Sequence, residues 1–227
     1  TFAGTGITSF RMPSNLQYIA PETFRNCEQL KTFYIGKAFR GKINYGEEGD
    51  PDTLFLYYAP IRLIQIDKEN TSYQLQNEIL YTRDGHILCQ ALKNDNADSQ
   101  LTIPSCVTEI ADGAFYRNSE FGTIEVKGSL ERIGISAFAC ADVGSFYVKG
   151  GVNYLDRRSF YQSAISEWRC HGGVKKYEKS AFQDVDATNG YAIDMNAITK
   201  LYQELLYVNA TTDLSYWVKT IWNWIIM

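Results

Sequence analysis

GAFYRNSEFGTIEVKGSLERIGISAF, residues 113–138, runs from one Ala-Phe pair to the next and contains one complete unit of a repeat. Four phenylalanines recur at spacings of 23, 22 and 22 residues: Phe115, Phe138, Phe160 and Phe182. The same order of apolar positions follows each of the first three: Phe121, Ile124, Val126, Leu130 and Ile133 in the first unit. A unit of this size cannot bury its own apolar side, so the period predicts a solenoid of stacked units. We expect the four phenylalanines to form a buried column.

The same register extends over most of the chain as short apolar strands. Their first residues are Phe10, Phe33, Ile64, Leu101, Ile124, Phe146, Trp168 and Tyr191. Two intervals exceed the ~23-residue period, which predicts insertions within about 36–59 and 70–99. The first contains GEEGDPD (46–52), typical of an exposed loop, and the second contains Asp84-Gly85 between apolar runs, typical of a β-hairpin. We expect both to decorate one domain spanning residues 1–227.

Longer motifs resemble a known family. LTIPSCVTEIADGAFYRN (101–118) and ITSFRMPSNLQYIAPETFRNC (7–27) resemble the repeat unit of BspA-like (bacterial surface antigen type) leucine-rich-repeat proteins. IQIDKENTSYQLQNEILYTRDG (64–85) resembles a module inserted in that family, and YAIDMNAITKLYQELL (191–206) resembles its closing strand and helix. The resemblance implies a right-handed α/β repeat solenoid with a parallel sheet of short strands, irregular or short helical returns, and a helical C-terminal cap at about 196–227.

Composition narrows the function classes. The net charge of −4 and the pI near 5.3 provide no basic footprint for nucleic acid. No apolar run approaches the ~20 residues of a transmembrane helix, so we expect no transmembrane segment in this chain. The resemblance implies an exported or surface-attached bacterial protein. The first residue, Thr1, is not methionine, so we expect a mature or trimmed form without its export signal.

The five cysteines allow two interpretations. An odd number in an exported protein is compatible with disulfides. The repeat favours reduced, buried thiols, because Cys27 and Cys140 follow a repeat phenylalanine and Cys170 occupies an inward strand position. We therefore predict no disulfide among these three. No C-x-x-C pair is present, which argues against a zinc or redox motif.

Candidate catalytic, cofactor and metal motifs are incomplete. GKAFRGK (36–42) has the spacing of a phosphate-binding loop, but Ile43 stands where the Ser or Thr is required. The acidic residues of 47–52 lack the spacing of a calcium loop. Cys170 and His171 are neighbours on a strand and should point to opposite faces. We predict a non-enzymatic protein without catalytic residues, cofactor or metal.

The outward positions of the strands form the candidate ligand-binding face. Parallel strands lie ~4.8 Å apart, which should bring six side chains together. They are Tyr147, Lys149, Arg169, His171, Glu125 and Lys127. Tyr and Arg are enriched in binding hot spots, and Lys149 with Arg169 would favour an anionic partner. The alternative is a charged face that only confers solubility.

The resemblance implies adhesion, and the expected function is binding of host, matrix or cell-surface proteins or glycans. The alternative is a structural spacer that displays another module of a larger surface protein. The aromatic C-terminus also has two interpretations: a cap over the last turn, or an interfacial or partner-binding helix. Its aromatic residues are Tyr216, Trp217, Trp222 and Trp224.

Overall fold

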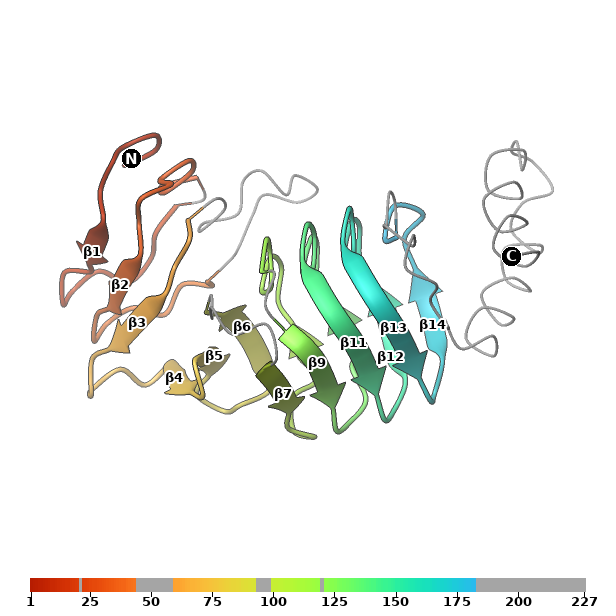
Figure 1. Cartoon of the computed structure of the whole chain (residues 1–227). Helices are drawn as coiled ribbons and strands as arrows, with labels where there is room; N and C mark the ends of the chain where they lie inside the picture. Colours follow the sequence, from red (N-terminus) through yellow and green to blue (C-terminus); the bar gives the residue numbers. More distant parts are fainter. Residues whose placement is uncertain (21, 44–58, 93–98, 119–120, 183–227) are drawn as a thin grey trace.

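The computed structural model describes residues 1–20, 22–43, 59–92, 99–118 and 121–182. These residues form a β-solenoid of fourteen strands in three sheets, and no helix occurs within these ranges (Figure 1). The N-terminal sheet contains β1 (Ser9–Arg11), β2 (Thr32–Ile35) and β3 (Leu63–Ile66). The front sheet contains β7 (Ser99–Ile103), β9 (Phe121–Val126), β11 (Asp142–Val148) and β13 (Ala164–Cys170).

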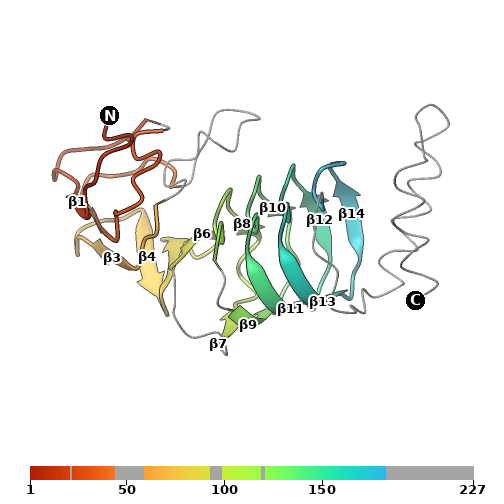
Figure 2. The same cartoon turned by 45° about the horizontal axis from the view of Figure 1, so that its top comes forward.

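The third sheet, here called the return sheet, has the order β14-β12-β10-β8-β6-β5-β4. Its strands are β4 (Tyr73–Gln76), β5 (Ile79–Thr82), β6 (Ile87–Ala91), β8 (Glu109–Ile110), β10 (Arg132–Ile133), β12 (Val152–Leu155) and β14 (Val174–Tyr177). Figure 2 shows β9, β11 and β13 in one layer with β8, β10, β12 and β14 in the layer behind them. The apolar positions of each repeat fill the space between the two layers.

The predicted strand register is confirmed within each of two sheets, but the step from Ile64 to Leu101 is not a strand pairing. Phe10, Phe33 and Ile64 are Cα partners in the N-terminal sheet. Leu101, Ile124, Phe146 and Trp168 are successive partners in the front sheet, and all of these pairs are parallel. The expected strand at Tyr191, the acidic loop at 46–52, the proposed C-terminal cap and the aromatic C-terminus lie outside the described residues.

The expected α/β class is wrong for the described residues, and of the two expected kinds of return, irregular or short helical, the structure shows irregular ones. Each of four returns places two residues in the left-handed conformation, two positions before and two after its phenylalanine. In one return these are Ser136 (φ 52°) and Cys140 (φ 54°), and in the next Arg158 (φ 54°) and Gln162 (φ 49°). Residues of this conformation end a right-handed helix at once, so the returns are series of tight turns.

Hydrogen bonds between neighbouring returns stabilise the left-handed backbone conformation of these residues. The Phe115 N–H donates to the Ala137 carbonyl at 2.7 Å, and the Phe138 N–H donates to the Ser159 carbonyl at 2.7 Å. The turns therefore form a parallel ladder of their own, perpendicular to the chain direction. Each return is stabilised by the next one in addition to its own turn hydrogen bonds, such as Ala139 N–H to the Ser136 carbonyl at 3.1 Å.

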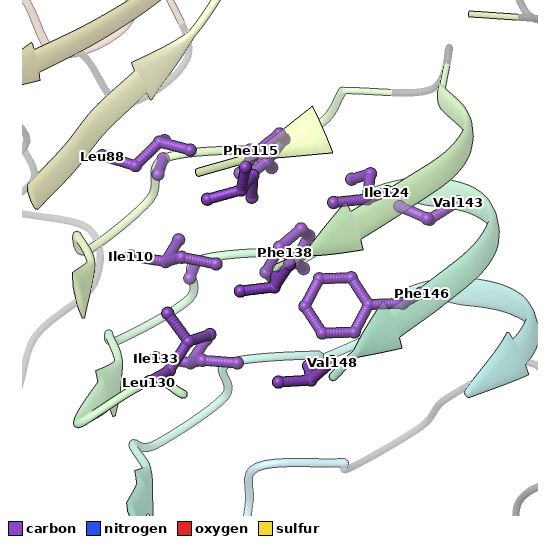
Figure 3. Close-up of a cluster of buried hydrophobic side chains, with 14 of the residues drawn as sticks. Leu88, Ile110, Phe115, Ile124, Leu130, Ile133, Phe138, Val143, Phe146 and Val148 are labelled. Atoms are coloured by element: carbon purple, nitrogen blue, oxygen red, sulfur yellow. The ribbon is translucent and has the colours of Figure 1, made fainter. Parts of the chain in front are cut away.

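The predicted phenylalanine column is confirmed. Phe115, Phe138 and Phe160 are completely buried, and Phe182 packs half-buried at the end of the same core. Successive rings are nearly parallel with centroids 4.6, 5.0 and 5.2 Å apart. In Figure 3, side chains of return strands, such as Ile110, and of front strands, such as Phe146, converge on Phe115 and Phe138 from opposite sides. The column is the centre of the layered core.

The second insertion forms the predicted hairpin, with a role that the sequence did not indicate. β5 and β6 are antiparallel around Asp84-Gly85, and Gly85 has a φ of 77°. Hydrogen bonds from the Thr82 hydroxyl and the His86 N–H hold the pKa of the Asp84 carboxyl below its ordinary value. A second hairpin joins β4 to β5 through Asn77 and Glu78, both with positive φ, as a type I′ turn requires.

The β5–β6 hairpin separates two hydrophobic cores. Ile79, Tyr81 and Leu88 pack into the core of the phenylalanine column. Leu80 and Cys89, which alternate with them along the strands, pack into a separate core beneath the N-terminal sheet. A strand buried on both faces acts as a wall between the two cores. The insertion therefore belongs to the interior packing of the solenoid.

Asn70 connects this insertion to the N-terminal sheet. It is 3% exposed, and its side chain makes four hydrogen bonds. The Nδ2 amide donates to the carbonyls of Gly36 (2.8 Å) and Phe39 (3.1 Å). The Oδ1 atom accepts from the N–H groups of Ser72 (2.8 Å) and Tyr73 (3.0 Å). One buried side chain therefore joins the turn after β2 to the start of β4.

The cysteines are reduced, as the repeat indicated, but the predicted burial of Cys140 is wrong. All five are free thiols, and Cys27, Cys89 and Cys170 are buried. Cys140 does not occupy a core position: it is half-exposed, because it lies two residues after its phenylalanine, at the left-handed position. Cys27 lies three residues after Phe24, where the other returns place buried side chains. These are Asn118, Ala141 and Ser163.

The exposure of the thiols predicts their reactivity. Cys106 and Cys140 should react with a maleimide in the folded protein, whereas Cys27, Cys89 and Cys170 should react only after unfolding. Burial raises the pKa of the Cys89 thiol to about 12, so its reactive thiolate is scarce at neutral pH. Intact-mass spectrometry should show two labels before denaturation and five after it. A disulfide-linked peptide joining Cys27, Cys140 or Cys170 would contradict this assignment.

Candidate functional site

The front sheet brings the six predicted binding residues together in two adjacent rows. Glu125, Tyr147 and Arg169 are Cα partners on β9, β11 and β13. The residue before each of them is buried in the core, so these three side chains point outward. The second row, Lys127, Lys149 and His171, follows directly at the ends of the same strands and is exposed. We call this surface the front-face patch.

The two lysines of the front-face patch share one carboxylate. Lys149 Nζ lies 3.0 Å from Glu125 Oε1, and Lys127 Nζ contacts the other oxygen of the same carboxylate. Hydrogen bonds from Lys127 and then Lys149 hold the pKa of Glu125 below its ordinary value. Both ammonium groups remain accessible, with side-chain exposures of 39% for Lys127 and 56% for Lys149. Their positive charge is thus partly neutralised on the face itself.

Glu167 belongs to the patch and was not among the predicted residues. Its carboxylate accepts a hydrogen bond from the Tyr147 hydroxyl and forms an ion pair with Arg169. The Arg169 guanidinium carbon also lies 5.7 Å from the centroid of the Tyr147 ring. Glu167 is on the same strand face as Arg169, two positions earlier, in the row of Thr123 and Ser145. The sequence pattern could have identified Glu167, because it belongs to the outward row two residues before that of Tyr147 and Arg169.

This pairing reduces the basic character that the sequence suggested. The patch contains three cations, Lys127, Lys149 and Arg169, and two carboxylates, Glu125 and Glu167. Each of the three cations contacts one of the two carboxylates. The surface therefore offers alternating charges and hydrogen-bonding groups around one tyrosine, with a small excess of positive charge.

A cluster of the same composition lies on the N-terminal sheet. The Arg11 guanidinium carbon lies 3.9 Å from the centroid of the Tyr34 ring, and the Tyr34 hydroxyl donates to Asp67 Oδ2 at 3.0 Å. The Glu69 N–H and the Tyr34 hydroxyl hold the pKa of Asp67 below its ordinary value. Arg11 and Tyr34 are strand partners, as Tyr147 and Arg169 are. Both sheets thus present an Arg-Tyr pair at the same outward position. Its carboxylate comes from the row after the pair on the N-terminal sheet and from the row before it on the front sheet.

The return sheet presents a different arrangement centred on Arg132. Its guanidinium contacts Glu109 (2.8 Å) and Asp156 (2.9 Å), and it also pairs with Asp112. Burial alone would lower the pKa of Arg132, but the carboxylates of Asp112 and Asp156 raise it above its ordinary value. Glu109 and Asp112 come from the turn before Arg132 and Asp156 from the turn after it, so the cluster spans three successive turns of the solenoid. The cluster is therefore an internal tie between turns.

The side chains of Cys170, His171 and His86 lie apart from one another in the described structure. Cys170 is buried and donates to the Gly173 carbonyl at 3.2 Å, whereas His171 is exposed, so the two point to opposite faces as predicted. His86 lies exposed on the hairpin turn, 3.9 Å from Asp84. In the portion that the structure describes, no three His, Cys, Asp or Glu side chains are grouped closely enough to hold a metal ion.

A comparison with models of protein families found one family whose repeat matches most of this chain. The model described as "BspA type leucine rich repeat region" matches residues 1–45 and 85–189 in six copies. These ranges include the N-terminal sheet's first two strands and the whole front sheet. No curated protein matches the chain. Within the described ranges, no helix has the length and apolarity that a membrane span requires.

One solved structure supports the fold, and two others are similar to a lesser degree. The pneumococcal vaccine antigen PcpA is 14% identical, with a TM-score of 0.55 over 88% of this chain and 66% of that one. A leucine-rich cell surface protein from Faecalibacterium prausnitzii is 14% identical (TM-score 0.48, 86% of this chain, 63% of that one). A leucine-rich repeat protein from Eubacterium ventriosum is 17% identical (TM-score 0.43, 82% and 67%). The chain thus spans about two thirds of these proteins.

Proposed function

Because the chain belongs to the BspA-type leucine-rich-repeat family, we propose that it is a non-enzymatic, exported or cell-surface protein that binds other proteins or glycans. The observation that carries this proposal is the front-face patch, where Tyr147, Arg169 and Glu167 contact one another on adjacent strands. The proposed location is supported by relatives of the same fold that are described as a vaccine antigen and a cell surface protein.

The chemistry of the patch narrows the proposed partner. Tyr and Arg are the side chains most enriched in binding hot spots. Lysines paired with Glu125 and the Arg169–Glu167 pair present donors and acceptors side by side. A partner with mixed hydrogen-bonding groups, such as a polar protein surface or a glycan with a carboxylate, complements this pattern better than a uniformly anionic polymer. Screening the purified chain on glycan and extracellular-matrix arrays is the first test.

A double variant tests the patch once a partner is found. Tyr147→Ala combined with Arg169→Ala should weaken binding at least tenfold while the protein stays folded, because hot-spot side chains dominate interface energetics. The matched control is Arg11→Ala combined with Tyr34→Ala, which removes the equivalent pair from the N-terminal sheet. Surface plasmon resonance provides the affinities. Undiminished binding by the first variant would remove the front-face patch from the proposal.

A structural spacer is the second candidate, and one observation favours it. Every cation of the front-face patch is already paired with a carboxylate of the same face, as expected of a surface that only maintains solubility. A spacer should bind nothing on the arrays above background, and the Tyr147 and Arg169 substitutions should then alter only stability. The binding proposal requires at least one saturable partner.

A further inference from the structure

The repeat lattice is interrupted between the N-terminal sheet and the front sheet. Along the return sheet, β6 continues the lattice by pairing in parallel with β8. On the opposite side, β7 ends the front sheet and β3 ends the N-terminal sheet, and within the described residues no strand pairs with both. Figure 1 shows β4, β5 and β6 between β3 and β7. Among the described residues, the front layer therefore has no strand at the level of β6.

The edge of β7 presents main-chain groups to this interruption. The Lys127 N–H donates to the Ile103 carbonyl at 3.0 Å, which fixes the residues of β7 that bond toward β9. Hydrogen-bonding directions alternate along a parallel strand, so the N–H and C=O of Thr102 point the other way. The Thr102 side chain is exposed, and its neighbours Leu101 and Ile103 are buried. The edge of β7 therefore has main-chain groups with which another strand can pair, next to the buried side chains of Leu101 and Ile103.

A groove of about 370 Å³ runs along this edge. Ile79, Leu92, Leu101 and Phe121 form its apolar wall, and Glu78 and Thr102 are among its polar lining. Ile79 and Leu92 come from the β5–β6 hairpin, so the wall of the groove is the same element that separates the two cores. Its volume fits a few extended residues and is too small for a folded domain.

We propose that this groove binds an extended peptide, which adds as a strand parallel to β7. Main-chain groups of the peptide would pair with Thr102, and alternate side chains would enter against Ile79 and Leu92, as in other cases of strand addition to a sheet edge. The occupant is a peptide because a main-chain edge is complemented by main chain, and β7 already pairs in parallel with β9 on its other side. This site adjoins the front-face patch, since Thr102 is the Cα partner of Glu125, but it lies on the other edge of β7 and its argument does not depend on the patch.

The probe for this proposal is a fluorescein-labelled peptide with the sequence FGTIEVK, residues 121–127. In the protein this sequence pairs in parallel with β7 on one edge and with β11 on the other, so both of its edges can pair. Fluorescence anisotropy should show saturable binding to the full chain with a Kd below about 1 mM. A version N-methylated at alternate amides should lose the binding, because it keeps the side chains and loses the main-chain donors.

Substitutions at Thr102 test the assigned edge. Thr102→Pro removes the N–H that points into the groove and leaves the bonds toward β9 intact, since proline is tolerated on edge strands. It should weaken peptide binding at least tenfold at an unchanged circular-dichroism spectrum. Thr102→Val keeps the N–H and is the matched control, which should bind as the parent does.

Three outcomes would overturn the proposal. The first is absence of saturable binding, and the second is equal binding by a folded Thr102→Pro variant. The third is binding only after residues 93–98 are replaced by a Gly/Ser sequence of equal length, which would make the chain's own connection the occupant. If sedimentation instead shows a dimer that Thr102→Pro dissociates, the occupant is a second copy and the peptide proposal fails.

Discussion

Replacing Phe138 with alanine is expected to lower the free energy of unfolding by about 3–5 kcal/mol. The ring is completely buried and stacks on Phe115 at 4.6 Å and on Phe160 at 5.0 Å. Its removal leaves a cavity between two rings that the solenoid backbone holds at a fixed spacing, so the site cannot collapse. Each turn of a solenoid is stabilised mainly by its neighbours, so the turns before and after should also lose stability. Urea unfolding followed by circular dichroism measures the change.

The matched control for this substitution is Phe182→Ala. Phe182 stacks on Phe160 at 5.2 Å but is only half-buried, so its replacement should have a smaller effect. An unchanged unfolding midpoint for Phe138→Ala, or an equal effect of the two substitutions, would mean that the column does not stabilise the core in the way described.

Asn70→Ala is expected to have the second largest effect, about 3 kcal/mol. The substitution removes the Asn70 partner of two buried carbonyls, of Gly36 and Phe39, and of two N–H groups, of Ser72 and Tyr73. The Gly36 carbonyl then keeps only the longer bond from the Phe39 N–H, at 3.3 Å. A buried group without a partner loses its hydration and gains nothing in return. Asn70→Asp should also destabilise the protein, because a carboxylate cannot donate to the two carbonyls. Thermal unfolding of both variants provides the comparison.

Asn15→Ala is the control, because Asn15 is exposed and its replacement should stay within about 0.5 kcal/mol of the parent. A stability of Asn70→Ala equal to that of the control would show that water can replace the four hydrogen bonds. The sequence Asn70-Thr71-Ser72 is also an N-glycosylation sequon. Since both amide hydrogens of Asn70 are used inside the folded protein, a glycan at this position would be incompatible with the observed packing.

The strand register could be predicted from sequence because it depends on a periodic pattern of apolar residues. Phe146 and Trp168 stand at the same position of consecutive units, and the structure pairs them directly. The conformation of the returns could not be predicted in the same way. Ser136 and Arg158 have no local preference for positive φ, and the hydrogen bonds from one return to the next impose it. Cys140 is a different case: it lies two residues after its phenylalanine and Cys27 three, and this offset, visible in the sequence, separates the half-exposed thiol from the buried one.

The candidate site was predictable to the extent that it follows the strand lattice. Alternation along β11 and β13 places Tyr147 and Arg169 outward and beside each other, as the sequence indicated. The choice of partners was not predictable, because it depends on side-chain conformations across three rows. Arg169 pairs with Glu167 of its own strand, which changes the electrostatic character expected of the patch. The wall formed by Leu80 and Cys89 required tertiary contacts and has no counterpart in the repeat pattern.

The wall between the two cores has a consequence for cooperativity. In a regular solenoid, stability passes from turn to turn through a continuous apolar interior, so that unfolding of one end propagates along the array. Here Ile79 and Leu80, adjacent on one strand, face different cores, and the β5–β6 hairpin carries the coupling between them. The two halves can therefore behave as separate foldons, each with its own opening free energy, joined by the hairpin. Loss of the contacts that Ile79 and Leu80 make with the two cores would uncouple the halves while the repeats on either side keep their own strands.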